Sequence, residues 1–168
     1  MKETANYVFF FGGMYSQWAG IPFQEGDVKF NCTEQYMMYW KALAFGDLKS
    51  AERIMETYNP AEQKAIGRKV KGFNDERWDL IKYQVVYQGN YLKFSQNPDL
   101  LDTFLIKHKD KMFVEASPTD TIWGIGRDLS FPYLEDQSKW NGQNLLGCAI
   151  KEVQQKLIED EVPIYSIS

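Results

Sequence analysis

The sequence predicts an α+β fold, with one mostly helical domain over residues 1–168 and a small β-sheet. Three observations support this prediction. Residues 7–11 and 112–116 are short apolar runs of β-favouring side chains. Helix start signals dominate the chain between these two runs. A length of 168 residues suits a single domain, and a hydrophobic content of 44% is enough for a core without disulfides or metals.

The first predicted strands lie near the start of the chain. Residues 7–11 end at a pair of glycines, as expected of a buried strand. Residues 28–30 alternate apolar and polar side chains, a pattern typical of a strand. Between them, residues 16–18 and 21–23 are expected to form loop or edge structure.

Helices are predicted from residue 33 onward. Thr33 is expected to cap the first helix, which runs to about Phe45 and ends at Gly46. Five further helices are predicted to begin at capping residues: Asp47, Asn59, Asn74, Asn97 and Asn144. Apolar faces are predicted at Tyr36, Trp40, Leu43 and Ala44 in the first helix, at Trp78, Ile81, Val85 and Leu92 in the longest, and at Leu146, Ile150, Val153 and Leu157 in the last.

The composition argues against several classes of protein. A net charge of −4 disfavours sequence-blind coating of nucleic acid. Cys32 and Cys148 lack the spacing of a zinc site and are expected to be buried free thiols. His108 lies in a charged run and is expected to be a solvated loop residue, so we predict neither a metal nor a cofactor. The chain shows no signal-peptide pattern and no apolar run of 18 residues, so we expect a cytoplasmic protein without membrane contact.

The first predicted helix carries a polar stripe. Glu34, Met38 and Lys41 are spaced so that they share one helix face. Glu34 by itself is explained by its favourable position at a helix N-terminus, and Lys41 by exposure to solvent. The helix is otherwise apolar nearly all round, however, so the stripe must face either water or a cleft.

Three other features are candidates for binding. Trp78 is either a core ring or the wall of a site. Arg68, which follows Gly67 in a basic cluster, either balances a helix C-terminus or holds a phosphate. Residues 120–126 place Asp120 beside Trp123 and two glycines, which suits close approach of a ligand and stacking of a base.

The segment from residue 118 to residue 143 is long and irregular, yet it contains several aromatic residues. This combination favours an ordered, functional loop. The segment is not a phosphate-binding or dinucleotide-binding loop, because it lacks both glycine fingerprints. Glu115, just before it, either joins a site or pairs with a surface lysine.

Six motifs are spread along the chain: Ser16-Gln17-Trp18 before Pro22-Phe23, Thr33-Glu34-Gln35-Tyr36 with Lys41, Gly67-Arg68, Trp78, Asp120-Thr121-Ile122-Trp123-Gly124, and Gly142-Gln143-Asn144-Leu145-Leu146-Gly147. Together and in this order they resemble the NADAR family, also called YbiA-like proteins, over about residues 9–157. One departure is Gln17, which stands where the family usually has Asn, and residues 126–142 carry aromatic and acidic side chains that bear on substrate choice.

The resemblance implies hydrolysis of an N-glycosidic bond between ribose and a nitrogen base. Some members of the family are similar to enzymes that clear ribosylaminopyrimidine phosphates of riboflavin synthesis, and others to enzymes that remove ADP-ribose from guanine in nucleic acid. The expected partners are therefore a small N-ribosyl phosphate, or ADP-ribosyl-guanine with transient nucleic-acid contact. The predicted catalytic residues are Glu34, Asp120 and Lys41, and the predicted substrate-binding residues are Trp78, Trp123, Arg68, Tyr36, Ser16, Trp18, Gly124 and Asn144.

Several alternatives remain open at this point. Either Glu34 or Asp120 stabilises the anomeric carbon while the other manages the leaving group. A neutral Lys41 offers a different route through a Schiff base. The alternative function is a non-catalytic module that binds ADP-ribose or NAD in the same cleft, and a third possibility is an interaction protein whose aromatic residues only fill the core.

Overall fold

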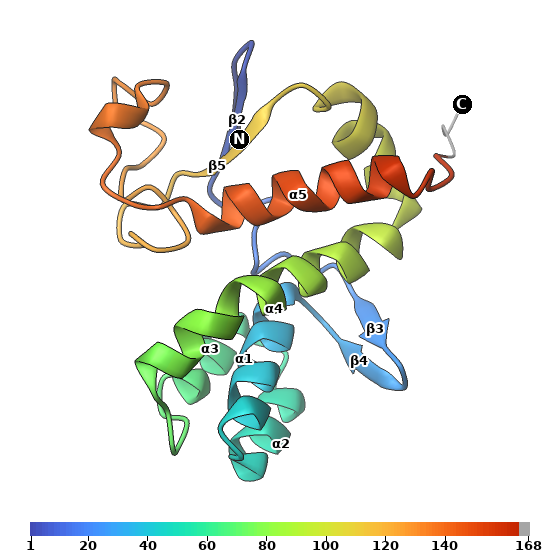
Figure 1. Ribbon diagram of the computed structural model, residues 1–168, viewed down its shortest axis with the longest axis vertical. Coiled ribbons are helices and arrows are strands. Elements are labelled where there is room, and N and C mark those ends of the chain that lie inside the picture. Colours follow the sequence, from blue (N-terminus) through green and yellow to red (C-terminus); the bar gives the residue numbers. More distant parts are fainter. Residues whose placement is uncertain (165–168) are drawn as a thin grey trace. The chain divides into compact units, whose positions relative to one another are not determined.

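A computed structural model of the protein describes residues 1–164, which form two compact units (Figure 1). Residues 1–16 and 97–164 make up what we call the sheet unit, and residues 17–96 make up the helical unit. Helices predominate and the sheets are small, so the predicted α+β class is confirmed. No helix within residues 1–164 is both long and apolar enough to cross a membrane.

The sheet unit is built on three short strands: β1 (Lys2–Glu3), β2 (Tyr7–Phe10) and β5 (Met112–Glu115). Strand β2 lies in the middle, antiparallel to β1 and parallel to β5. Both longer strands were predicted from their apolar runs. The two-residue β1 is too short to leave a pattern in the sequence.

Helix α5 (Leu145–Glu159) packs against β5 and closes the core of the sheet unit (Figure 1). A Cβ atom at Gly147 would collide with the carbonyl oxygen of Phe113, so only glycine permits this close approach. The inward face of this helix was predicted correctly. Its four expected core residues are all fully buried: Leu146, Ile150, Val153 and Leu157.

The helical unit combines a hairpin with four helices. Strands β3 (Phe23–Glu25) and β4 (Val28–Phe30) form the antiparallel hairpin. Helix α1 (Thr33–Ala44) contacts each of the other helices, α2 (Leu48–Glu56), α3 (Pro60–Gly67) and α4 (Asp75–Ser95). The predicted caps of the last three are confirmed, since the side chains of Asp47, Asn59 and Asn74 each accept a backbone N–H of the first turn.

Two predicted caps are wrong. Cys32, in extended backbone, precedes α1, and the hydroxyl of Thr33 instead donates to the carbonyl oxygen of Gln17 at 3.1 Å. Asn144 precedes α5 as expected, but in a left-handed conformation with φ of 53° and with its side chain bonded to β5. In both cases a partner distant in sequence competes with the local cap for the same polar group.

The predicted helix from Asn97 to Ile106 is replaced by two shorter segments. Pro98–Leu100 forms one turn of 3₁₀ helix, and Asp102–Lys107 forms a π-helix. The wider π turn still buries Phe104 and Leu105 in the core of the sheet unit. A further 3₁₀ turn, Gln137–Lys139, lies in the long loop before α5.

The predicted apolar face of α4 is only partly correct. Trp78 is buried, but Ile81 is exposed, and the buried stripe continues through Val86, Asn90 and Lys93. A fully buried lysine cannot be predicted from hydrophobic spacing. Burial lowers the pKa of Lys93 to about 7, while the nearby thiol of Cys32 opposes this shift.

His108 contradicts the prediction of a solvated loop residue, because its side chain is fully buried. Its Nδ1 lies 2.6 Å from the hydroxyl of Tyr15, and its Nε2 lies 3.2 Å from a carboxylate oxygen of Glu3. The charged neighbours that suggested exposure, Lys107 and Lys111, turn their ammonium groups towards the same Glu3 carboxylate. The imidazole of His108 therefore packs in the aromatic core around Tyr15.

The two cysteines are free thiols, as predicted. Cys32 is buried and donates its S–H to the side-chain oxygen of Gln63 at 3.2 Å. Cys148, on α5, is only partly buried. Burial raises the pKa of both thiols, so neither is primed as a nucleophile.

Candidate functional site

The polar stripe of α1 exists in the structure and belongs to the helical unit. Glu34 is buried, with 6% of its surface exposed, and its backbone N–H donates to the carbonyl oxygen of Gln17 at 2.9 Å. Lys41 is partly buried two turns later. A carboxylate hidden from water on the same helix face as a lysine does not fit the interpretation of a solvated stripe.

Several neighbours set the protonation of Lys41. Burial has the largest influence and lowers the pKa of this amine. The carboxylates of Glu34 and Asp75 oppose that effect, whereas the guanidinium of Arg68 adds to it. These mutual influences place the charges of α1, the end of α3 and the start of α4 around one amine.

Two aromatic rings flank the same amine. The Nζ atom of Lys41 lies 4.5 Å from the ring centre of Phe73 and 5.9 Å from that of Trp78. Trp78 is itself buried, with 7% of its surface exposed. It is therefore a core ring, and its face also borders a charged group.

The Gly67-Arg68 pair is explained by close helix packing. A Cβ atom at Gly67 would collide with the sulfur of Met38, so glycine allows α3 to approach α1. Arg68 is the C-cap residue of α3 and is exposed. It therefore occupies a helix C-terminus, as one interpretation expected, while its charge also reaches Lys41.

Tyr36 lies in a different cluster of the helical unit. Its hydroxyl donates to Glu25 at 2.8 Å, and its ring packs on Phe23 and Phe30. Trp40 donates its indole N–H to the other carboxylate oxygen of Glu25 at 3.0 Å. Tyr36 thus fixes the hairpin to α1, and its predicted contact with substrate stays a prediction.

Gln17 anchors the start of α1. The carbonyl oxygen of Gln17 accepts both the backbone N–H of Glu34 and the hydroxyl of Thr33, and its side-chain oxygen accepts from Asn90 at 3.0 Å. Gln17, the departure from the family pattern, is therefore a buried anchor that helps to position Glu34. Trp18 beside it is 47% exposed, and Ser16, in the sheet unit, closes a turn onto Gly13.

The loop at residues 120–126 belongs to the sheet unit. One carboxylate oxygen of Asp120 accepts the backbone N–H groups of Ile122 and Trp123, at 2.9 and 2.8 Å. Gly124 is buried, and a Cβ there would come within 2.9 Å of the carbonyl oxygen of Glu115. Asp120 consequently shapes the turn that presents Trp123.

Asn144 joins this loop to β5. Its side-chain oxygen accepts from the backbone N–H of Glu115, its amide N–H donates to the carbonyl oxygen of Phe113, and its own backbone N–H donates to Gly124. The side chain is 2% exposed. Both ends of the amide are thus occupied within the sheet unit, which makes Asn144 a residue that positions the loop.

The structure assembles the predicted residues in two groups. Glu34, Lys41, Arg68 and Trp78 come together in the helical unit, with Tyr36 in a neighbouring cluster. Asp120, Trp123, Gly124 and Asn144 come together in the sheet unit. The convergence of the two groups on one substrate stays a prediction.

Sequence reasoning missed two residues near Lys41. Phe73 lies in the α3–α4 loop, where no helical spacing marks it, and Asp75 is the first residue of α4. Asp75 resembled an ordinary acid in a first helical turn. No signal in the sequence distinguished either residue from a structural one.

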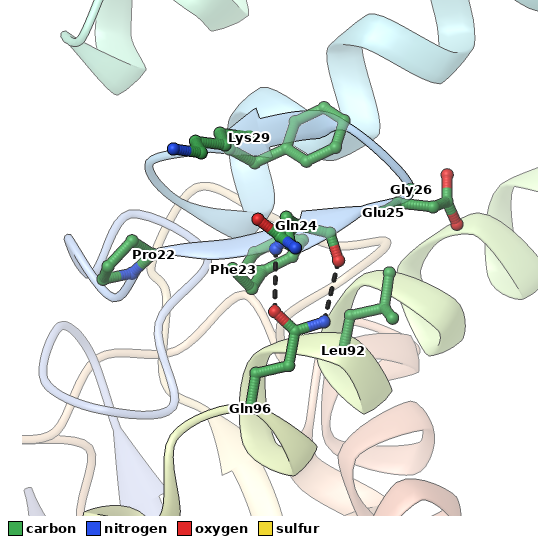
Figure 2. A pocket seen from close by; sticks show the side chains of 9 residues that line it. Pro22, Phe23, Gln24, Glu25, Gly26, Lys29, Leu92 and Gln96 are labelled. Carbon is green, nitrogen blue, oxygen red and sulfur yellow. Dashed lines mark hydrogen bonds between the residues drawn. The ribbon is translucent and has the colours of Figure 1, made fainter.

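A cavity of about 630 Å³ lies elsewhere in the helical unit, between the β3–β4 hairpin and the end of α4 (Figure 2). Figure 2 shows the side chain of Gln96 exchanging two hydrogen bonds with the backbone of Gln24, at 2.7 and 2.8 Å. None of the predicted site residues lines this cavity. Within residues 1–164, no cluster of three or more His, Cys, Asp or Glu side chains could hold a metal ion.

Comparison with known proteins shows to which family the chain belongs. The sequence profile of the NADAR domain matches residues 8–158 and so spans parts of both units. The chain belongs to the NADAR family. This confirms the resemblance predicted from the six motifs.

The relatives also carry an enzyme class in their names. The chain is 41% identical over 167 residues to an N-glycosidase of Acanthamoeba polyphaga mimivirus, covering 92% of this chain and 98% of the relative. It is 30% identical over 116 residues to the chloroplastic riboflavin biosynthesis protein PYRR of Zea mays, covering 64% of this chain and 18% of that protein. The predicted enzyme class, an N-glycosidase of the NADAR family, is confirmed.

A solved structure supports the fold. The NMR structure of the E. coli protein YbiA matches 99% of this chain and 93% of its own with a TM-score of 0.77, at 22% sequence identity. At this identity the match concerns the fold.

Proposed function

We propose that this N-glycosidase hydrolyses the bond between ribose and a nitrogen base, and that its substrate is either ADP-ribosylated guanine in nucleic acid or a ribosylaminopyrimidine phosphate. The observation that carries the proposal is the partly buried amine of Lys41, which shares a helix face with the buried Glu34 and is bordered by Trp78 and Arg68. The N-glycosidase name of the mimivirus relative supports the reaction, and the name of the maize relative supports the second substrate.

The chemistry needs charge stabilisation at the anomeric carbon. As the bond from C1 to nitrogen breaks, positive charge grows on the sugar, and a carboxylate such as Glu34 stabilises it. In the direct route, water then attacks C1, a carboxylate takes the proton of the water, and the departing nitrogen receives a proton. Asp120 is the candidate for the second carboxylate of this route, and the alternative is that it only shapes its loop.

The second route uses Lys41 as a nucleophile. If the sugar ring opens, the neutral amine adds to C1, the base leaves as a protonated amine, and a Schiff base forms between C1 and Nζ. Water then hydrolyses this imine and releases the free sugar. Burial lowers the pKa of Lys41 and so favours the neutral amine that this route requires.

Arg68 and the two tryptophans would bind the rest of the substrate. A guanidinium pairs with phosphate through two parallel hydrogen bonds, and both candidate substrates carry phosphate. Trp78 and Trp123 offer ring faces for the base or the ribose. Trp78 belongs to the helical unit and Trp123 to the sheet unit.

The test is a parallel assay of purified protein on ADP-ribosylated guanine DNA and on ribosylaminopyrimidine phosphate, each with Glu34→Ala as the inactive reference. Release of free ADP-ribose or of ribose 5-phosphate identifies the substrate. Tight binding with no release of sugar from either compound would favour the alternative, a non-catalytic module that binds ADP-ribose or NAD.

Borohydride distinguishes the two chemical routes. It should trap a protein–sugar adduct on wild-type protein and none on Lys41→Arg, which keeps the charge but cannot form an imine. Lys49→Arg, a change at an exposed lysine of α2, is the matched control and should trap normally. Full activity of Lys41→Arg would remove the Schiff-base route and leave direct attack by water.

A further inference from the structure

The α3–α4 loop brings an aromatic ring to Lys41 that no motif indicated. Phe73 is 40% exposed, yet its ring centre lies only 4.5 Å from Nζ of Lys41, closer than the ring of Trp78 at 5.9 Å. A ring at this distance from an ammonium group lies within the range of a cation–π contact.

The ring of Phe73 is held from its other side. It packs edge-to-face on Phe45 with ring centres 5.3 Å apart, and the guanidinium of Arg77 lies 5.3 Å from the ring of Phe45. Gly72 precedes it with φ of 77°, a conformation that favours glycine and turns the chain back towards α1. The loop is therefore built to present this ring to Lys41.

We propose that Phe73 is a positioning residue that covers the amine of Lys41 and keeps it available as a nucleophile. The proposal rests on the role of Lys41 in the proposed function. The ring is more exposed than that of Trp78, 40% against 7%.

A phenylalanine ring acts on a nearby ammonium in two opposing ways. Its π face attracts the positive charge, which favours the ammonium by about 0.5–1 kcal/mol at exposed sites. Its bulk excludes water, which favours the neutral amine. Burial is the largest influence on the pKa of Lys41, so we expect the exclusion of water to dominate.

The charged groups around Lys41 stay in place when Phe73 is changed. Glu34 on α1, Arg68 at the end of α3 and Asp75 at the start of α4 all act on the same amine. Substitutions at Phe73 that alter only cover or only π character therefore separate the two effects of the ring.

The experiment measures the reactivity of Lys41 from pH 6 to 11 by competitive labelling with acetic anhydride and peptide mass spectrometry. Exposed Lys49 serves as the internal reference. In Phe73→Ala, which removes cover and ring, the labelling midpoint of Lys41 should move to higher pH. In Phe73→Leu, which keeps apolar cover without the π face, the labelling midpoint of Lys41 should stay in place or move to lower pH. Phe73→Tyr should restore the wild-type profile.

The direction of the midpoint decides the outcome, because a change of access alone alters the final labelling rate and leaves the midpoint in place. An unchanged midpoint in Phe73→Ala, or equal upward shifts in the Ala and Leu variants, overturns the inference. Borohydride trapping at pH 7 should fall in Phe73→Ala, because a larger fraction of the amine is protonated once the ring no longer excludes water. A shifted midpoint in a protein that traps no sugar supports the positioning role and instead refutes the Schiff-base route.

Discussion

The two units use their candidate residues in different ways. In the helical unit, Glu34 and Lys41 carry their charged groups on one face of a regular helix and influence each other. In the sheet unit, Asp120 bonds to the backbone of its own loop, and Asn144 bonds to the backbone of β5. The residues predicted from the motifs are therefore of two kinds: charged groups that act on each other, and groups that hold a loop in shape.

This difference has a physical origin. A helix satisfies its own backbone hydrogen bonds, so its polar side chains are left for other tasks. An irregular loop has no such ladder, and its buried N–H and C=O groups need side-chain partners. We therefore expect larger effects on the rate from substitutions of the candidate residues in the helical unit than from those in the sheet unit.

The largest effect is expected for Glu34→Gln. Loss of a general acid or base should lower the rate by about 10²-fold or more while the fold is retained, because the amide has nearly the same shape. The rate of sugar release under saturating substrate is the measurement. Glu52→Gln, at an exposed position of α2, is the control and should be fully active. A near-normal rate in folded Glu34→Gln would show that the helical unit does not carry the larger effect on the rate.

Asp120→Asn tests the sheet unit in the same way. The amide oxygen of Asn can still accept from Ile122 and Trp123, so a loop-shaping residue should lose only about tenfold or less in rate. Asp120→Ala, which removes the acceptor, should lose more. Asp128→Asn is matched, since Asp128 accepts from Ser130 in a similar turn, and it should leave the rate unchanged. A 10²-fold loss in Asp120→Asn would instead make Asp120 a catalytic carboxylate.

Regular elements could be predicted from the sequence because their causes are local. The buried stripe of α5 follows from helical spacing, and the caps at Asp47, Asn59 and Asn74 follow from neighbouring residues. The stripe on α1 was predicted in the same way. These features need no knowledge of distant contacts.

The errors arose where a distant partner determines the structure. His108 was assigned to solvent from its neighbours in sequence, yet Tyr15 and Glu3 bury it. Thr33 looked like a cap, but Gln17 takes its hydroxyl. Phe73 reaches Lys41 only because a loop returns to α1, and no periodic pattern records such a return.

A stability effect of intermediate size is expected for Asn144→Ala. The backbone N–H of Glu115 and the carbonyl oxygen of Phe113 lose their partner in a buried place, which should cost about 2 kcal/mol in the free energy of unfolding. Urea denaturation followed by tryptophan fluorescence measures it. Asn141→Ala, at an exposed position of the same loop, is the control and should change little. Equal stabilities of the two variants would show that the bonds of Asn144 do not hold the loop.

The smallest effect is expected in the pH dependence of the sheet unit. Burial lowers the pKa of His108 below its ordinary 6.5, while Glu3 opposes this, and the bond to Lys107 lowers the pKa of Glu3 to about 2. Both groups bind protons more readily when unfolded, so their contribution to stability should be full above pH 6.5 and decline as the pH falls, first through His108 and then, below 4.5, through Glu3.

Urea midpoints at pH 8, 6 and 5 test this decline. His108→Gln keeps a polar partner for Tyr15 but does not titrate, so its stability should change less between pH 8 and 5 than that of wild type. Glu3→Gln, by contrast, should keep the decline that begins below pH 6.5, because His108 is still buried. If wild type and His108→Gln follow the same pH profile, the group that titrates below pH 6.5 is not His108. Lys93 is not that group either, because its shift from 10.5 to about 7 changes stability above pH 7.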